Sequence, residues 1–244
     1  MKKTRKNTVI LAKNISKSYL LRTERPTAIE KIFSKKKTNR RFALKNININ
    51  IKQGERVGVI GNNGSGKTTL LKILAGITQP TSGKVLVRGK VVSIIDITAG
   101  FHLDLNGIEN IFLNGLIIGL RKQEINQRLD KIIKFIDIGD YINAPLYTYS
   151  AGMILRVGFS VAIFSNPDIL LIDESFAVGD EIFRKKAIQK FEEFAEQQKT
   201  LVVVSHWPGF IKKNCNRVIH LKKGKIVHDG GLDLLDLYFT MPQC

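Results

Sequence analysis

Hydrophobic and polar residues follow two periods along this chain, and the shorter period marks its strands. Leu44–Ile51 alternates apolar and polar residues, which predicts a strand with one buried face. Val9–Leu11 predicts an opening strand before it. Short apolar runs, of the kind that fills the middle of a parallel sheet, occur at Arg56–Ile60, Ile169–Ile172 and Thr200–Val204.

The longer, helical period separates these strands. Two hairpins are expected, one over Gly83–Ile95 and one that turns at Lys223 and Gly224. Strands that alternate with helices predict an α/β fold with a parallel-sheet core and an antiparallel β piece at the start. The expected helices are Thr68–Ala75, Ile108–Leu120, Lys122–Ile136, Met153–Phe164 and Phe183–Gln198.

Length and composition fit one large domain. The chain has 244 residues, 43% of them hydrophobic, as in ordinary globular proteins. Cys215 and Cys244 are too few for a disulfide framework, and we expect free thiols in a reducing compartment. No apolar run approaches the roughly 20 residues of a membrane span. Val9–Ala12, after the basic start, is shorter than the about 7–15 residues of a secretion signal, so we expect a cytosolic chain.

Positive charge is abundant and partly clustered. The net charge of +18 favours anionic neighbours such as nucleic acid, phospholipid head groups or acidic polymers, while lysine-rich solvated faces explain it equally well. Residues 22–41 hold eight basic and two acidic residues and interrupt the strand pattern. We interpret this stretch as a basic insertion.

A glycine-rich motif lies between a predicted strand and a predicted helix. Gly61-Asn-Asn-Gly64-Ser-Gly66-Lys67-Thr68 fits the phosphate-loop pattern G-x-x-x-x-G-K-[ST]. Its glycines let backbone N–H groups surround phosphate oxygens, Lys67 reaches the β- and γ-phosphates, and the Thr68 hydroxyl is a ligand for Mg²⁺. The residues expected to bind nucleotide are Gly61, Asn62, Asn63, Gly64, Ser65, Gly66, Lys67, Thr68 and Thr69.

Two carboxylates follow the apolar run Ile169–Ile172. Asp173 stands at the tip of that predicted strand, where it can hold Mg²⁺ or its water shell. Glu174 follows directly and is placed to polarise an attacking water. A strand-end acidic pair in a loop is the simpler interpretation, but the phosphate loop favours a catalytic pair.

A third segment resembles the signature of ABC ATPases. Tyr149-Ser-Ala-Gly-Met153 precedes a predicted helix, and its Ser150 lies 23 residues before Asp173. It is similar to the variant signature of polysaccharide exporters. The resemblance implies that Ser150, Ala151, Gly152 and Met153 contact the ATP of a second subunit. Taken alone, a serine before a helix is only an N-cap.

Other segments agree with this family. Asp180 ends a segment similar to the family's D-loop, and His206 follows the strand Thr200–Val204 as the switch histidine does. Tyr19 lies where the family carries an aromatic residue that stacks on adenine; a core tyrosine is the alternative. The usual glutamine after the first hairpin is missing, and Asp96 is the nearest polar residue in its place.

The resemblance covers Asn14 to about Gly230 and is closest to exporters of O-antigen, capsular polysaccharide or teichoic acid. It implies a P-loop NTPase of ABC type, with a RecA-like core, an antiparallel β subdomain and a helical subdomain near 100–156. It also implies ATP and Mg²⁺, hydrolysis helped by Glu174 and His206, and a homodimer joined to two copies of a polytopic permease. We expect a peripheral protein on the cytoplasmic face of the inner membrane.

Several alternatives stay open. The charge allows a soluble ABC ATPase that acts on nucleic acid or ribosomes, although we expect no nucleic acid because tandem nucleotide domains are absent. A GTPase or kinase would leave Ser150–Met153 unexplained, and an importer fits the motifs less well. The basic insertion 22–41 contacts lipid head groups, the permease or a phosphate-bearing lipid, or it is a solvated loop. We expect no C-terminal carbohydrate-binding domain, so the permease would handle the polysaccharide.

Overall fold

The computed structural model of the protein describes residues 7–21, 39–95, 99–173, 180–233, 235 and 238. Its main element is a six-stranded sheet with the order β5-β6-β7-β3-β8-β9. The first five of these strands run parallel, and β9 pairs antiparallel with β8. The strands are β3 (Arg56–Ile60), β5 (Val91–Ile94), β6 (Ile169–Ile172), β7 (Thr200–Val204), β8 (Arg217–Lys222) and β9 (Lys225–Gly230).

The sheet is covered on both faces, which explains why its central strands are continuous apolar runs. One face packs against the helices α5 (Ala151–Phe164), α6 (Glu181–Glu196) and α7 (Pro208–Asn214). The other face packs against α2 (Lys67–Leu74) and the antiparallel sheet described next. Every residue of β6 and β7 is buried. The strand predictions for β3, β6 and β7 are confirmed.

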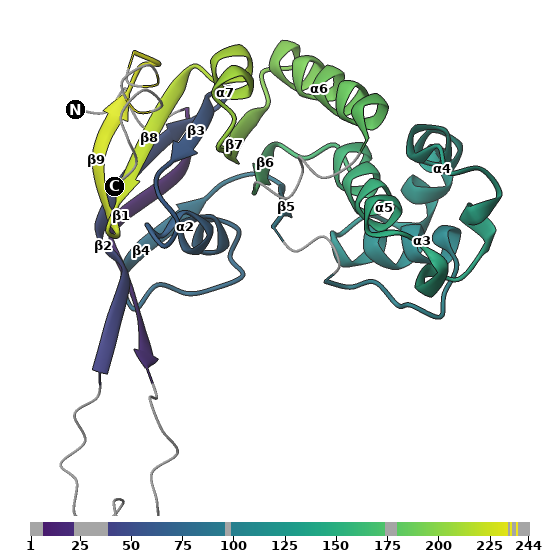
Figure 1. The fold of residues 1–244 in the computed structure, drawn as a ribbon, viewed down its shortest axis with the longest axis horizontal. Coiled ribbons are helices and arrows are strands. Elements are labelled where there is room, and N and C mark those ends of the chain that lie inside the picture. The colour runs from purple at the N-terminus through teal and green to yellow at the C-terminus, as the bar shows by residue number, and fades with distance from the viewer. Residues whose placement is uncertain are drawn as a thin grey trace, which may run out of the picture.

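A three-stranded antiparallel sheet has the order β2-β1-β4. It consists of β1 (Thr8–Leu21), β2 (Asn39–Lys52) and β4 (Ser82–Val87). The far ends of β1 and β2 project from the body as a two-stranded ribbon (Figure 1). The opening strand is longer than Val9–Leu11 because β1 continues through a bulge near Asn14, whose φ is 50°. Residues 39–41 of the basic stretch lie in β2, and 22–38 lie outside the described residues.

The hairpin predicted over Gly83–Ile95 is wrong. Its first half is β4, which pairs with β1, and its second half is β5, which pairs with β6 in the other sheet. The physical reason is burial: alternate residues of β5 are buried against the helices of the main sheet, whereas β4 is largely exposed. The hairpin predicted at Lys223 and Gly224 is confirmed as the β8–β9 turn.

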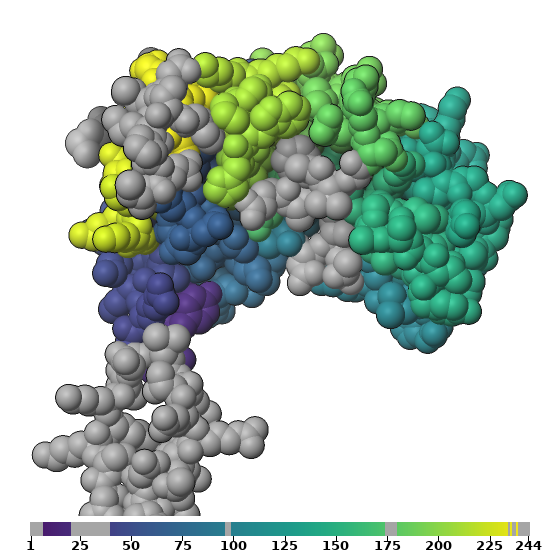
Figure 2. Space-filling view, viewed as in Figure 1, coloured from purple at the N-terminus to yellow at the C-terminus, as the bar shows by residue number. Residues whose placement is uncertain are grey.

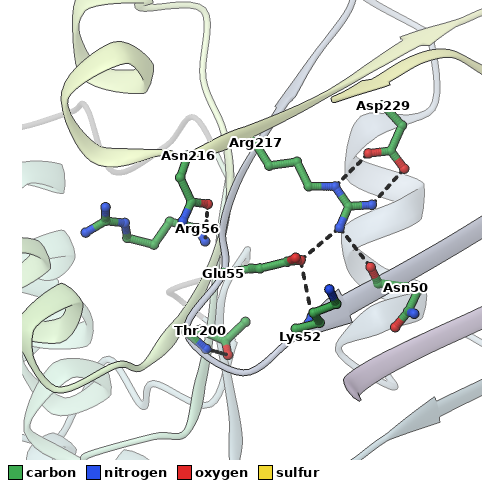
Figure 3. Close-up of polar contacts among 9 residues, drawn as sticks. Asn50, Lys52, Glu55, Arg56, Thr200, Asn216, Arg217 and Asp229 are labelled. Atoms are coloured by element: carbon green, nitrogen blue, oxygen red, sulfur yellow. Dashed lines mark hydrogen bonds and ion pairs between the residues drawn. The ribbon is translucent and has the colours of Figure 1, made fainter. Parts of the chain in front are cut away.

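A polar cluster joins the two sheets at the amino end of β3 (Figure 3). The Arg217 guanidinium donates to both Asp229 oxygens, at 2.6 and 2.8 Å, and to Glu55 Oε2 at 2.8 Å. It also donates to the Asn50 carbonyl of β2 at 2.8 Å. The Arg217 cation therefore links β2, β8 and β9. Its hydrogen bonds to Asp229 raise the pKa of the guanidinium above its ordinary value.

A helical lobe forms one end of the molecule, and β8 and β9 lie at the other (Figure 2). It contains α3 (Gly107–Ile117), α4 (Lys122–Ile136) and the 3-10 turns η2 (Gly139–Asn143) and η3 (Leu146–Thr148), with α5 packed against them. Edge-to-face contacts of Phe135, Phe159 and Phe183 join this lobe to α6. Within the described part of the chain, no helix has the length and apolar character of a membrane span.

Candidate functional site

The loop between β3 and α2 has the geometry of an anion cradle. Three of its glycines have positive φ values, 149° at Gly61, 76° at Gly64 and 108° at Gly66. A side chain would strain each of these conformations. The Lys67 ammonium reaches across the loop and donates to the carbonyls of Gly61 at 2.6 Å and Asn62 at 3.2 Å. The positive charge is therefore held over the loop's backbone turn.

Backbone from distant segments lines one side of this loop. A Cβ on Gly66 would lie 2.5 Å from the Ala43 carbonyl oxygen of β2, and a Cβ on Gly224 would lie 2.6 Å from the same atom. The Gly224 amide donates to the Ser65 carbonyl at 3.0 Å, and the Lys45 amide donates to Gly224 at 2.7 Å. The loop is thus enclosed by β2 and by the β8–β9 turn. Only glycine allows such close approach at both positions.

The N-terminus of α2 is left open to a ligand. Its cap residue, Gly66, has no side chain to satisfy the first N–H groups, and no acidic residue lies in the first turn. The buried Ser65 Oγ has no hydrogen-bond partner among the described residues. Free N–H groups at a positive helix end favour an anion, and a phosphate fits both this charge and the glycine cradle. This geometry is compatible with the predicted phosphate loop, and phosphate binding by it stays a prediction.

Three neighbouring strands end at this same edge of the sheet. The phosphate loop follows β3, Ser205 and His206 follow β7, and Asp173 follows β6. Parallel strands deliver their carboxyl ends to one edge, where α/β proteins bind ligands. Asp173 is 9% exposed as a whole residue, while Thr68 is exposed at the start of α2. Glu174 and Asp96 lie outside the described residues.

Carboxylate and hydroxyl oxygens are ligands that Mg²⁺ accepts, so Asp173 and Thr68 together form a suitable donor set beside a phosphate. No group of three or more metal-binding side chains occurs in the part of the chain that the structure describes. Mg²⁺ is usually held by one or two protein ligands together with substrate phosphates and water.

The signature turn begins a second helix, α5, in a different setting. Ser150 caps this helix, its Oγ accepting from the Met153 amide at 3.2 Å. Ser150 and Ala151 are exposed, and Gly152 and Met153 are partly exposed. In Figure 1, α5 packs with the helical lobe, while α2 lies under the antiparallel sheet. The structure does not place this turn on the phosphate loop of its own chain.

Asp180 has two structural contacts. Its Oδ1 accepts from the Phe183 amide at 2.8 Å and so caps α6. Its Oδ2 pairs with Arg156 of α5. Arg156 also donates to the Asp137 carbonyl at the end of α4, at 3.0 Å. Asp180 therefore ties the start of α6 to the signature helix α5.

Tyr19 lies near the far end of β1, two residues before Leu21, and pairs with Arg41 of β2. Its side chain is 45% exposed, and the Lys17 ammonium lies 5.3 Å from the ring centroid. The exposed ring can accept a stacked base, and its role toward adenine stays a prediction. Sequence reasoning missed Tyr238, whose hydroxyl donates to Asn62 Oδ1 at 3.1 Å. No local motif marks it, because the contact joins residues 176 positions apart.

Comparison with known proteins gives one consistent result. The family model described as ABC transporter matches residues 44–177. The O-antigen export system ATP-binding protein RfbB of Myxococcus xanthus is 46% identical over 75% of this chain and 42% of its own length. The teichoic acids export ATP-binding protein TagH of Listeria innocua is 42% identical over 91% of this chain and 66% of its own length. The chain thus spans less than two thirds of either relative.

Solved structures agree with the sequence comparison. A dimeric ATP-binding cassette, solved in a post-hydrolysis state with ADP and Pi, superposes with a TM-score of 0.74. The two are 26% identical, and the match covers 91% of this chain and 98% of that one.

Proposed function

The chain belongs to the ABC transporter family, and from this premise we propose that it hydrolyses ATP to drive export of a lipid-linked polysaccharide. Its fold is the P-loop ABC type that the sequence predicts. The observation that carries the proposal is the enclosed cradle Gly61–Thr69, with Asp173 at the same edge of the sheet.

In this proposal the phosphate loop binds the β- and γ-phosphates of ATP. Loop amides and the N-terminus of α2 donate to the phosphate oxygens, and Lys67 leaves its two carbonyl partners to pair with the γ-phosphate. Thr68 and Asp173 would hold Mg²⁺, which neutralises phosphate charge. Tyr19 would stack on adenine.

Hydrolysis needs a water aligned with the γ-phosphate. Glu174 would accept a proton from that water, because it directly follows Asp173 at the end of β6. His206, at the end of the neighbouring strand β7, would hydrogen-bond the γ-phosphate side of the site. Asp96 follows β5 in the place of the family's usual glutamine, and we assign it no phosphate-sensing role.

A second copy of the chain would complete each site. The N-terminus of α5, with Ser150 and Gly152, is accessible and carries positive helix-end charge. Facing the γ-phosphate of the other copy, it would close two ATP molecules into a head-to-tail dimer. The similar cassette solved as a dimer supports this arrangement. Asp180, tied to the signature helix through Arg156, would transmit closure between the two sites.

The names of the two relatives support a proposal for the transported substrate and the partner. One is named for O-antigen export and the other for teichoic acids export, and we propose a lipid-linked polymer of this class. The partner would be two copies of a polytopic permease, with this chain peripheral on the cytoplasmic face of the membrane. Both names favour export over action on nucleic acid or ribosomes. The basic insertion 22–41 would belong to this membrane-side assembly.

The test is ATP hydrolysis and polymer transport by proteoliposomes that hold the chain with its permease. Lys67→Ala should lower hydrolysis by about 100-fold or more and stop transport, because a preorganised cation is lost from the γ-phosphate. Lys84→Ala removes an equal charge from an exposed position on β4 and should leave both rates unchanged. Normal hydrolysis by Lys67→Ala would refute the site. Hydrolysis that moves no polymer would refute the transport assignment.

A further inference from the structure

Two described residues after β9, Leu235 and Tyr238, contact the body of the fold, and Tyr238 reaches the phosphate loop. Leu235 is fully buried in the hydrophobic cluster that includes Phe210 and Val218, which anchors this segment to the main sheet. Three residues later, the Tyr238 ring packs edge-on against His220 of β8, with centroids 4.7 Å apart. The Tyr238 hydroxyl then donates to Asn62 Oδ1 at 3.1 Å.

Asn62 accepts two of the hydrogen bonds that hold the phosphate loop in its turn. Its carbonyl accepts from the Ser65 amide at 3.0 Å, which forms the turn of the cradle. The same carbonyl accepts from the Lys67 ammonium at 3.2 Å. The Asn62 side chain is exposed and would rotate freely without a partner, so the hydrogen bond from the tyrosine hydroxyl restricts this side chain.

We propose that Tyr238 is a positioning residue for the nucleotide site, which holds Asn62 so that the phosphate loop is preorganised for ATP. The inference rests on the proposed ATP-binding function and extends it to a residue outside the family's motifs. A loop already held in its binding shape loses less conformational entropy when phosphate arrives, so the ordering cost falls. The expected effect is therefore on nucleotide affinity and not on the rate at saturating ATP.

The chemistry of the contact suits this role. Burial raises the pKa of the Tyr238 hydroxyl, although the Gly61 backbone opposes the shift, so the hydroxyl stays protonated as a donor at neutral pH. Burial lowers the pKa of His220, and Lys222 and His228 lower it further, so the ring beneath Tyr238 is neutral there. The contact is thus a hydrogen bond between neutral groups. Its loss should change the equilibrium constant for nucleotide binding by about five-fold.

A purely structural role would give a different result. If the ring only seals the edge of β8, Tyr238→Phe keeps the packing on His220 and changes nothing at the loop. If the hydroxyl positions Asn62, Tyr238→Phe weakens nucleotide binding and Asn62→Ala weakens it by a similar factor. The double variant should then bind less weakly than the product of the two single effects predicts, because both changes remove the same Tyr238–Asn62 bond.

Two measurements on the purified chain decide this. The first is the affinity for a fluorescent ATP analogue, with KM and kcat for ATP, where Tyr238→Phe should raise Kd and KM about five-fold and leave kcat nearly unchanged. The second is hydrogen exchange of the Ser65 amide without nucleotide, which should quicken in Tyr238→Phe. Tyr147→Phe is the matched control, since that ring is 65% exposed on the helical lobe.

Wild-type affinity and wild-type Ser65 exchange in Tyr238→Phe would overturn the inference. Should Tyr238→Phe not fold, Asn62→Ala decides by the same two measurements, with unchanged affinity and exchange again counting against it. If the unmodified chain binds no nucleotide, the proposed function fails, and the exchange data still show whether Tyr238 holds the loop.

Discussion

Two helices in this molecule, α2 and α5, have a glycine at or near their N-terminus, but the two N-termini differ in capping and in surroundings. The helix α2 begins at Gly66, with no side-chain cap, and backbone from β2 lies against it. The helix α5 begins at Ser150, which caps its own helix. Among the described residues, a Cβ on Gly152 would have only the Ser150 hydroxyl within 4 Å, at 3.8 Å. The first is enclosed so that a ligand meets a rigid cradle. The second is open on a surface that a partner can approach.

The comparison shows that glycines near a helix start differ in whether the fold itself requires them. At Gly66 the left-handed backbone and the close Ala43 carbonyl both exclude a side chain. At Gly152 the backbone is helical and the described residues leave room for a Cβ, so the described part of the fold accepts a side chain there. The same kind of substitution should therefore fail inside the fold at one site and only in the assembled dimer at the other.

The largest expected effect follows Gly66→Ala. Forcing alanine into a φ of 108° costs about 1–3 kcal/mol, and its Cβ would also press on the Ala43 carbonyl. We expect a lower free energy of unfolding by urea and a loss of affinity for a fluorescent ATP analogue of about 100-fold or more. Normal stability and normal nucleotide binding in Gly66→Ala would show that the β2 backbone at Ala43 can move aside. Gly76→Ala has a positive φ but open space, so it isolates the cost of strain.

A smaller, separable effect is expected for Gly152→Asp. An acidic residue in the first turn stabilises a helix by about 0.3–1 kcal/mol, so the fold should not suffer. In the dimer, however, the carboxylate would meet the γ-phosphate of the other copy, and hydrolysis should fall by about 100-fold. Nucleotide binding to the single chain should stay the same. Gly152→Ala is the control for added bulk alone.

Size-exclusion chromatography with ATP separates the outcomes for Gly152→Asp. If Gly152→Asp loses the ATP-dependent dimer but still binds nucleotide, the result supports a role for α2 within its own chain and a role for α5 only in the dimer. Loss of binding in the single chain would contradict it, because α5 would then belong to the site of its own chain.

The sequence predicts the first of these regions far better than the second. The apolar runs of β3, β6 and β7 are buried on both faces, and the glycines and Lys67 encode the cradle locally. The signature turn could be found only by resemblance, because an exposed Ser150 cap looks like any other helix start.

Long-range contacts could not be predicted from local patterns. Alternation marks both β4 and β5 as strands but does not say which sheet each joins. The close approach of Ala43 to Gly66 and the hydrogen bond from Tyr238 to Asn62 join segments that only the tertiary fold brings together. Turn and strand patterns carry no information on such pairs.

The smallest effect on the nucleotide site is expected for Arg217→Met, although its effect on stability is clear. Arg217 holds Asp229, Glu55 and the Asn50 carbonyl together, and so fixes β2 against β8 and β9 (Figure 3). Methionine keeps the apolar stem but leaves the two carboxylates without their shared cation. Breaking a charge-assisted hydrogen-bond network of this kind should lower the free energy of unfolding by about 2 kcal/mol.

The network lies at the amino end of β3, whereas the cradle follows the carboxyl end of the same strand. Affinity for nucleotide should therefore change by less than about two-fold, a few tenths of a kcal/mol. Urea unfolding and nucleotide titration of the same preparation check both parts, with Lys225→Met as the exposed control on β9. A large loss of affinity would mean that β2 encloses the loop only while Arg217 holds it. The rigidity of the cradle would then be set from the far end of the sheet and not by its own glycines.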